Sequence, residues 1–310
     1  MAKRLLIAAE ADRALVARAR ADGRFVVVDH PVRTEDELAA IVGHCEILVT
    51  RSYNRVTKRV LEAAPHLELI AQGTSGTDNI DAAAAAARGI TVLNLPGANA
   101  NAVAEMVIGH IIALTRTVPG YSAAMRRGIW NRDDCASRHE LRHYRVGIIG
   151  LGQVGSRVAR YAATFGMKVS AYDPYIGEFP ERVATLDELL RNADILTLHV
   201  PLTDETRAMI ASPQIAVLPP GAILINAARG EVLDTAAALD ALSRNHLAGL
   251  ALDVFDPEPP TRPWPDDPRL ILTPHIGGCT HEARSSIGSL LWDRISEFIL
   301  SRKSGSGSGA

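Results

Sequence analysis

The chain has 310 residues, more than one hydrophobic core usually organises, so two domains are predicted. Hydrophobic residues make up 47% and charged residues 22%, and the formal net charge of −2 disfavours nucleic acid as a partner. Cys45, Cys135 and Cys279 stand far apart, so neither a disulfide framework nor a metal site is predicted. No signal peptide and no uncharged run of the ~18 residues that span a bilayer is evident, so we expect a cytoplasmic protein.

The first third of the chain alternates short apolar runs with helical patterns. Strands are predicted at 4–9, 25–29, 46–50, 67–72 and 91–95. Helices are predicted at 12–20, 35–42, 57–63 and 81–88. Thr34 is the predicted N-cap of the second helix, and Asp78 or Asn79 that of the fourth. Strands separated by helices of this length indicate βαβ units and a parallel sheet.

A long helical segment at 99–127, interrupted at Pro119 and Gly120, precedes a second alternation of the same kind. Its strands are predicted at 145–150, 168–173, 194–200, 222–228, 247–254 and 270–273. Its helices are predicted at 154–165, 185–191, 213–217 and 234–244, and a last helix at 281–300. The sequence therefore predicts an α/β protein with two parallel-sheet units, the second beginning in mid-chain.

A glycine-rich turn opens the second unit. Gly150, Gly152 and Gly155 form the pattern GxGxxG between a predicted strand and a predicted helix. In dinucleotide-binding proteins these glycines allow the tight turn, the approach of a pyrophosphate and the packing of helix on strand. Asp173 follows at the spacing of a carboxylate that holds ribose hydroxyls and repels a 2′-phosphate, so NAD is the predicted cofactor. The alternative is a tight turn without a ligand.

Several motifs, met in order along the chain, resemble the D-isomer-specific 2-hydroxy acid dehydrogenases, and most of all their D-3-phosphoglycerate dehydrogenase branch. They are GTSGTDNID (73–81), ANANAVAE (98–105), GLGQVG (150–155), DILTLHVPLTDET (194–206), LINAARG (224–230), ALDVFDPEP (251–259) and TPHIGG (273–278). The resemblance implies two Rossmann-like domains, the NAD-binding one inserted into a flavodoxin-like substrate domain. The implied bounds are 1–97 with helix 281–303 for the substrate domain, 98–280 for the NAD-binding domain and 304–310 for a flexible tail.

The resemblance assigns catalysis to Arg229, Glu258 and His275. His275 would exchange the proton of the oxygen on carbon 2, because the pKa of imidazole lies near working pH. Glu258 would orient the imidazole, and Arg229 would bind the substrate carboxylate and polarise the carbonyl. Taken singly, each residue has an ordinary structural alternative: a surface ion pair, a solvated loop carboxylate and a buried structural histidine.

The resemblance also implies cofactor and substrate contacts. Besides Gly150, Gly152, Gly155 and Asp173, the cofactor residues are Gln153, Val154, Pro174, His199, Val200, Pro201, Thr206, Ala227, Ala228, Asp253, His275 and Gly277. The substrate residues are Arg51, Ser52, Ser75, Gly76, Asn99, Arg132, Arg229 and His275. Arg51 and Arg132 would meet a distal phosphate. Gln72 stands where the family has an arginine; it could still hydrogen-bond an oxyanion, but the lost charge weakens the prediction of a phosphate.

The expected reaction is the NAD-dependent interconversion of a small D-2-hydroxy acid, phosphorylated or phosphonylated, and its 2-keto acid. The alternatives are an unphosphorylated acid of the glyoxylate or hydroxypyruvate type and an NADH-sensing scaffold like the transcriptional corepressors. Formate dehydrogenases are disfavoured, because they have an amide side chain at the position that Glu258 occupies in this sequence. A homodimer through segment 99–140 is implied, with Tyr121, Ile129 and Trp130 as apolar contacts, and no C-terminal regulatory domain is expected.

Overall fold

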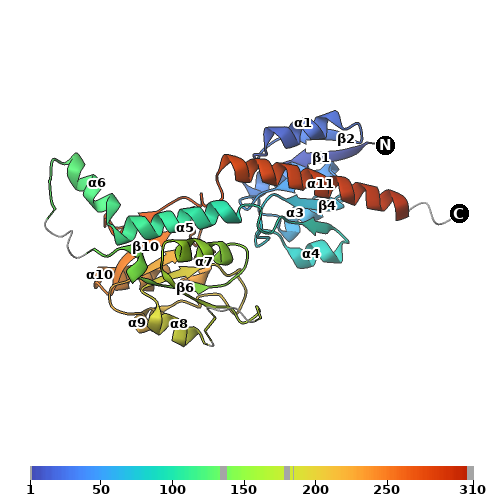
Figure 1. Cartoon of the computed structure of the whole chain (residues 1–310). Coiled ribbons are helices and arrows are strands. Elements are labelled where there is room, and N and C mark those ends of the chain that lie inside the picture. The colour runs from blue at the N-terminus through green and yellow to red at the C-terminus, as the bar shows by residue number, and fades with distance from the viewer. Residues whose placement is uncertain (1, 133–137, 178–181, 184, 306–310) are drawn as a thin grey trace. The chain divides into compact units, whose positions relative to one another are not determined.

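The computed structural model describes residues 2–132, 138–177, 182–183 and 185–305 (Figure 1). Contacts divide the chain into two units, one formed by residues 1–99 with 279–310 and the other by residues 100–278. Each unit contains one parallel sheet with helices on its connections. The prediction of two Rossmann-like parallel-sheet domains is confirmed, and the second unit is inserted into the first.

The first unit is built on a five-stranded sheet. Its strands are β1 (Lys3–Ile7), β2 (Phe25–Asp29), β3 (Ile47–Thr50), β4 (Leu69–Gln72) and β5 (Thr91–Leu93). All pairs are parallel, in the order β2-β1-β3-β4-β5, which is the flavodoxin-like order. The helices are α1 (Arg13–Ala21), α2 (Glu35–Ile41), α3 (Lys58–Glu62), α4 (Ala82–Ala87) and α11 (His281–Gly305). The chain adds β2 on one side of β1 and then β3, β4 and β5 on the other side, so the strand order reverses between β1 and β3.

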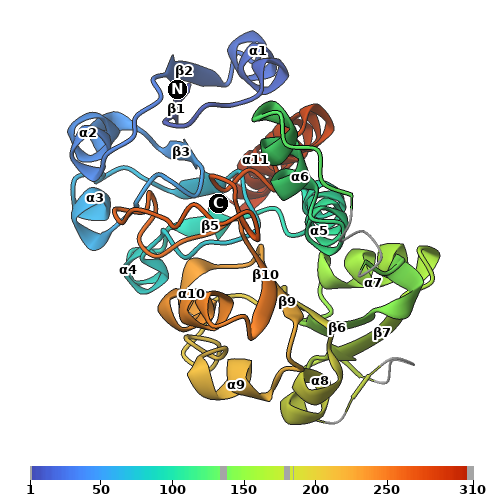
Figure 2. The same ribbon diagram turned by 90° about the vertical axis from the view of Figure 1, so that its left-hand side faces the viewer.

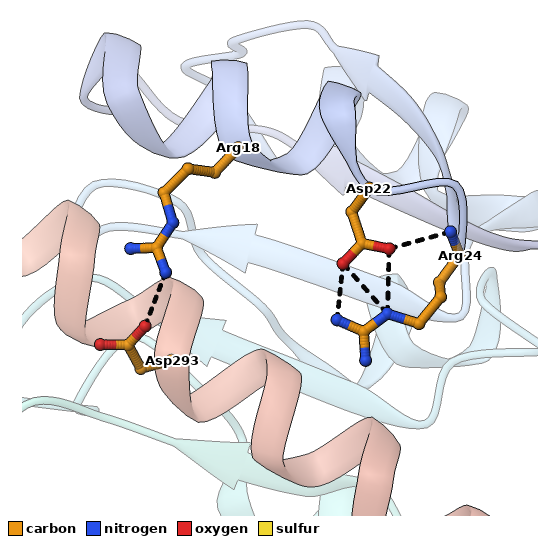
Figure 3. Close-up of polar contacts among 4 residues, drawn as sticks. All are labelled: Arg18, Asp22, Arg24 and Asp293. Carbon is orange, nitrogen blue, oxygen red and sulfur yellow. Dashed lines mark hydrogen bonds and ion pairs between the residues drawn. The ribbon is translucent and has the colours of Figure 1, made fainter.

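Helix α11 brings the C-terminal part of the chain back to the first unit. Its apolar side packs with α1 on one face of the sheet, and Trp292 meets the ring of Phe25 edge-on, with 5.5 Å between centroids. Arg18 on α1 donates to Asp293 on α11 at 2.8 Å, while Asp22 and Arg24 pair within the turn after α1 (Figure 3). Helix α11 extends two residues past the predicted domain bound at 303.

The second unit is built on a six-stranded parallel sheet, shown in Figure 2. Its strands are β6 (Arg145–Ile149), β7 (Lys168–Tyr172), β8 (Ile195–Leu198), β9 (Ala222–Asn226), β10 (Leu247–Leu252) and β11 (Leu270–Leu272), in the order β11-β10-β9-β8-β6-β7. Its helices are α5 (Ala100–Thr115), α6 (Val118–Arg126), α7 (Gly155–Thr164), α8 (Leu186–Asn192), α9 (Ser212–Val217) and α10 (Thr235–Ser243). The strand order reverses between β6 and β8, where open α/β sheets bind ligands.

The break in the long helical segment and the cap of α4 differ from the predicted ones. The long helical segment breaks at Thr117, which has a left-handed φ of 48°, and not at Pro119 and Gly120. Pro119 lies in the first turn of α6. Backbone N–H groups in a first turn have no acceptor within the helix, so a proline there costs no hydrogen bond. Helix α4 is capped by Asp81, whose side chain accepts from Ala84 N–H, and not by Asp78 or Asn79. The predicted cap at Thr34 is confirmed as a complete capping box.

Neither a membrane span nor a metal centre emerges from the described residues. In the described ranges no single helix is long and apolar enough to cross a bilayer; α5 and α6 have the necessary length and composition only together, and they are bent by 62° at the break between them. No group of three or more His, Cys, Asp or Glu side chains in the described ranges is arranged to hold a metal ion. Cys45 is buried and Cys279 exposed, each as a free thiol, and Cys135 lies outside the described residues.

Candidate active site

The loop between β6 and α7 brings backbone segments together where a side chain would not fit. Gly150 has a φ of +89°, and a Cβ there would lie 2.7 Å from the carbonyl oxygen of His199. A Cβ on Gly155 would lie 1.9 Å from the carbonyl oxygen of Gly150. By contrast, a Cβ on Gly152 would meet nothing within 4 Å. The first and third glycines therefore close the turn, and the second leaves its backbone open to a ligand.

This turn offers hydrogen-bond donors at the reversal of strand order. Within the described part of the chain, the N–H groups of Gly152, Gln153 and Val154 donate no hydrogen bond. They lie at the N-terminus of α7, where the helix dipole carries partial positive charge. Free N–H groups, positive charge and open backbone fit the pyrophosphate of a dinucleotide.

Asp173 stabilises the glycine-rich turn directly. Its Oδ2 accepts from the N–H of Leu151 at 2.9 Å, and its Oδ1 accepts from the N–H of Tyr175 at 2.9 Å. The side chain remains partly exposed, and each carboxylate oxygen has a second lone pair for a ribose hydroxyl. The predicted ribose contact stays a prediction, while the hold on the turn is an additional role that the spacing alone did not indicate.

The loop after β8 faces the same turn. The Nε2 of His199 shares a hydrogen bond with the Thr197 hydroxyl at 2.9 Å, and its buried Nδ1 has no hydrogen-bond partner among the described residues. Burial lowers the pKa of His199 to about 3, so the imidazole is neutral. The Thr206 hydroxyl donates to the Pro201 carbonyl at 2.6 Å and accepts from the Thr203 N–H. Thr206 thus stabilises this loop, and its contact with a phosphate stays a prediction.

The turn after β9 places Arg229. Asn226, 1% exposed, accepts from Ala228 N–H through Oδ1 and donates to the Arg229 carbonyl through Nδ2, at 3.0 and 2.9 Å. The Arg229 Nη1 then donates to the Ala228 carbonyl at 2.7 Å. Asn226 was not among the predicted site residues, although a buried amide at the carboxyl end of a strand was a signal for it. Asn226 therefore fixes the backbone from which the Arg229 side chain extends.

Glu258 and His275 form a hydrogen-bonded pair. The Nδ1 of His275 lies 2.8 Å from Oε2 of Glu258, so Nδ1 is the protonated nitrogen. The other carboxylate oxygen of Glu258 accepts from the N–H of Phe255 at 2.9 Å. The ring of Phe255 packs edge-on against Trp264, with 5.3 Å between centroids. Because the bond to Glu258 is made through Nδ1, the Nε2 of His275 has no hydrogen-bond partner in the described chain and is open for proton exchange.

Charge in this pair favours the imidazolium–carboxylate form. The hydrogen bond to Glu258 raises the pKa of His275 above its usual value, against the opposing effect of burial. Burial alone would raise the pKa of Glu258, but hydrogen bonds from His275 and Phe255 N–H outweigh it, and that pKa lies below its usual value. The positive charge of Arg229 lowers both pKa values. The three predicted catalytic side chains therefore share one electrostatic environment.

Asp253 holds the loop that carries His275. Its carboxylate is 3% exposed and accepts from the Thr273 hydroxyl at 2.6 Å, from Ile276 N–H at 2.9 Å and from Gly277 N–H at 2.8 Å. His275 lies between these anchors with a φ of +52°, a conformation that non-glycine residues seldom adopt. Asp253 is therefore a positioning residue for His275, and its predicted contact with the nicotinamide carboxamide remains a prediction.

In the first unit, the side-chain amides of a buried and a half-buried asparagine shape the turn that begins at Arg51. The N–H of Arg51 donates to Asn54 Oδ1 at 3.0 Å, and Asn54 donates to the carbonyls of Ala8 and Val32. Asn79 donates to the Arg51 carbonyl at 3.1 Å. Neither asparagine was predicted as a site residue. Together they fix the backbone from which the Arg51 guanidinium extends.

Gln72 does not replace the arginine that the family has at this position as a ligand for an anion. Its side chain is 0% exposed, and its Nε2 donates to the Thr74 hydroxyl at 2.9 Å and to Asn79 Oδ1 at 2.8 Å. Its Oε1 accepts from the Thr50 hydroxyl. The expectation that this amide could hydrogen-bond an oxyanion is wrong, because both of its ends are committed to shaping the glycine-rich turn after β4.

The other predicted substrate residues differ in their surroundings. The Ser75 hydroxyl donates to the Leu95 carbonyl at 3.1 Å and accepts from Gly97 N–H, so it ties the glycine-rich turn to the segment after β5. Ser52 and Arg132 are exposed, and Asn99 is half-buried. Arg132 belongs to the second unit, next to residues 133–137, which lie outside the described ranges. Their substrate contacts stay predictions.

Comparison with known proteins agrees with this geometry. Residues 108–277 match the model of the D-isomer specific 2-hydroxyacid dehydrogenase NAD-binding domain, which spans more than half of the chain. The chain belongs to the D-isomer specific 2-hydroxyacid dehydrogenase family. The Gly150–Gly155 turn lies inside the matched domain, as do Arg229, Glu258 and His275. The NAD-binding domain is thus identified both by sequence and by the geometry of its turn.

Individual relatives differ in name and length. The chain is 39% identical to a D-3-phosphoglycerate dehydrogenase of Methanocaldococcus jannaschii, over 86% of this chain and 52% of that protein. It is 38% identical to a hydroxypyruvate reductase of Thermotoga maritima, over 84% of this chain and 87% of that protein. A crystal structure of D-lactate dehydrogenase from Aquifex aeolicus with NAD and lactic acid superimposes with a TM-score of 0.84 at 28% identity, covering 96% of each chain. The chain thus spans about half the length of several phosphoglycerate dehydrogenases that it matches.

Proposed function

We propose that this protein catalyses the NAD-dependent interconversion of a small D-2-hydroxy acid and its 2-keto acid, and that the acid carries a phosphate or phosphonate group. The hydrogen bond between His275 Nδ1 and Glu258 Oε2, with Arg229 acting electrostatically on both, is the observation that carries the proposal. An acid–base histidine, its carboxylate partner and a carboxylate-binding cation are the groups that this chemistry needs.

Each residue has a definite task in the reaction. Bound NAD supplies the hydride chemistry at its nicotinamide ring. In the reducing direction, His275 Nε2 donates a proton to the oxygen on carbon 2; in the oxidising direction, the same nitrogen removes it. Glu258 keeps Nδ1 protonated and stabilises the imidazolium. Arg229 binds the substrate carboxylate through its planar fork and stabilises negative charge on the reacting oxygen.

The test of this function is NADH oxidation with a panel of 2-keto acids. The panel pairs phosphohydroxypyruvate and phosphonate analogues with hydroxypyruvate, pyruvate and glyoxylate. Turnover with at least one acid, lost in His275→Ala, supports the dehydrogenase function. NADH binding without turnover on any acid would contradict it and favour the NADH-sensing alternative.

An unphosphorylated acid is the second candidate, and two observations favour it. The Thermotoga maritima relative, which this chain matches over 87% of its length, is named hydroxypyruvate reductase. The buried Gln72 also supplies no charge where an arginine would serve a phosphate. A higher kcat/KM for hydroxypyruvate than for its phosphorylated counterpart would decide for this candidate and leave the proposed mechanism unchanged.

We also propose that two copies of the chain pair through segment 99–140. Helix α6 has no buried side chain, although it carries Val118 and Met125, which are 50% and 51% exposed. Ile129 and Trp130 follow it at 50% and 74% exposure. Several exposed large apolar side chains on one short segment are typical of a protein interface, and homo-oligomers are the commonest assemblies.

A further inference from the structure

A pocket in the first unit lies at the reversal of its strand order. It is lined by the segment after β1, which includes Glu10 and Asp12, by Thr50 and Arg51 at the end of β3, and by Gly73 after β4. Leu15, Val49 and the first three turns of α11, from Arg284 to Leu291, complete the lining. The carboxyl ends of parallel strands at such a reversal are the usual ligand site of open α/β sheets.

Two guanidinium groups line this pocket from different elements. Arg51 enters from the end of β3, and its side chain makes no hydrogen bond or ion pair with the described residues. Arg284 enters from α11, with a side chain that is 52% exposed. Its nearest acidic partner is Glu10, at the long distance of 3.9 Å. Both cations are therefore available to an anion at little cost.

The two acidic residues of the pocket are already engaged. Glu10 pairs with Arg33 at 2.6 Å, and the Arg33 guanidinium stacks on the ring of Tyr53, 4.3 Å from its centroid. Asp12 caps α1 by accepting from Ala14 N–H at 2.8 Å. Neither carboxylate depends on Arg51 or Arg284 for its main partner, so an anion in the pocket need not displace an established ion pair.

The resemblance to the family already implies that Arg51 meets a distal phosphate; we infer that Arg284 binds this phosphate together with Arg51 and determines the preference for phosphorylated over plain 2-keto acids. This inference rests on the proposed dehydrogenase function. It also gives a place to a second cation although Gln72 carries no charge: Arg284 on α11 lines the same pocket as Arg51. Two guanidinium groups match a phosphate dianion better than one, because each offers paired N–H donors.

The experiment compares the wild type with Arg51→Gln, Arg284→Gln and the control Arg294→Gln. Arg294 lies on the same helix, is exposed and does not line the pocket. The readout is the ratio of kcat/KM for phosphohydroxypyruvate to that for hydroxypyruvate. We expect Arg51→Gln and Arg284→Gln each to lower this ratio roughly 10- to 100-fold, the usual effect of removing a charge-assisted hydrogen bond, and Arg294→Gln to leave it unchanged.

A binding measurement on the same four proteins decides the site independently of turnover. Inorganic phosphate should raise the Tm of the wild type and of Arg294→Gln, and raise it less or not at all in the two pocket variants. Equal phosphate responses and equal substrate ratios in the wild type and Arg284→Gln would overturn the inference while leaving the dehydrogenase function standing. Absence of turnover on every keto acid would instead count against the proposed function. The change in Tm with phosphate would then still show whether Arg51 and Arg284 bind phosphate.

Discussion

The hydroxyl of Thr273 donates to Asp253 Oδ1 at 2.6 Å, and this contact begins the short loop that ends at Gly277 and carries His275. Asp253 lies just after β10 and Thr273 just after β11, so two neighbouring strands fix the position of the proposed general acid–base residue. Because the carboxylate also binds the N–H groups on the far side of His275, the left-handed backbone of that histidine is held from both ends.

Asp253→Asn should destabilise this loop. One oxygen would become an NH₂ group facing a backbone N–H donor, either Gly277 N–H or Ile276 N–H depending on which way the amide turns. Leaving a buried donor unsatisfied costs about 1–3 kcal/mol, and kcat should fall because His275 loses its alignment. Urea denaturation and steady-state kinetics measure the two effects. Asp256→Asn, an exposed position in the adjacent loop, is the matched control, and equal behaviour of the two variants would refute the positioning role.

Glu258→Gln should shift the pH dependence of keto-acid reduction to lower pH. Reduction requires protonated His275, and the hydrogen bond to Glu258 raises the pKa of that imidazole. With the charge removed, the histidine loses its proton at a lower pH, so the alkaline limb of kcat moves down. The pH profile of NADH oxidation checks this, and an unmoved alkaline limb would mean that another group titrates.

Arg229→Ala and His275→Ala should each lower turnover by about 10²- to 10⁴-fold, the range of general acid–base and electrostatic contributions. NADH binding should survive in both, because the glycine-rich turn and Asp173 lie on other loops of the sheet. Fluorescence titration with NADH provides the comparison. Near-full turnover in either variant would remove that residue from the mechanism.

Gly152→Ala and Gly155→Ala should fail in different ways. A methyl group on Gly152 meets no protein atom within 4 Å, so the fold should persist while the methyl obstructs the pyrophosphate and weakens NADH binding. A methyl group on Gly155 would overlap the carbonyl of Gly150, so Tm should fall as well. Thermal unfolding without cofactor separates the two. An equal loss of Tm in both variants would contradict the assignment of open space at Gly152.

Asp173→Ala should reduce the preference for NADH over NADPH, because the carboxylate that repels a 2′-phosphate is removed. The same change removes the hydrogen bond to Leu151 N–H, so affinity for both cofactors should also fall. Ratios of kcat/KM for the two cofactors test the first effect separately from the second, and an unchanged ratio would count against the proposed ribose contact.

Trp130→Ser should weaken self-association if segment 99–140 forms the dimer interface. Trp130 is 74% exposed in the single chain, so its replacement should cost the monomer little stability. Light scattering over a range of concentrations measures the assembly, with Tyr175→Ser, 78% exposed on the loop after β7, as the matched control. A monomeric wild type, or an unchanged dimer in the variant, would refute the interface.

The sequence by itself determined the two parallel sheets and the glycine-rich turn, and it indicated the three positions proposed for catalysis. Hydrophobic periodicity and turn residues are local signals, and motifs such as NAARG and PHIGG each specify a short stretch of chain. For that reason the N-cap at Thr34 was predicted correctly, and so were the strands that lead into Gly150 and Arg229.

The tertiary structure decided which polar groups serve as supports and which remain open to a ligand. Gln72 and Arg284 show the difference: from the sequence the first was a possible anion ligand and the second an unremarked helix residue. In the folded chain Gln72 is buried with both ends of its amide hydrogen-bonded, while Arg284 lines the same pocket as Arg51. A residue's hydrogen-bond partners come from strands and helices far away in the chain, so local pattern does not determine whether its donors are still free.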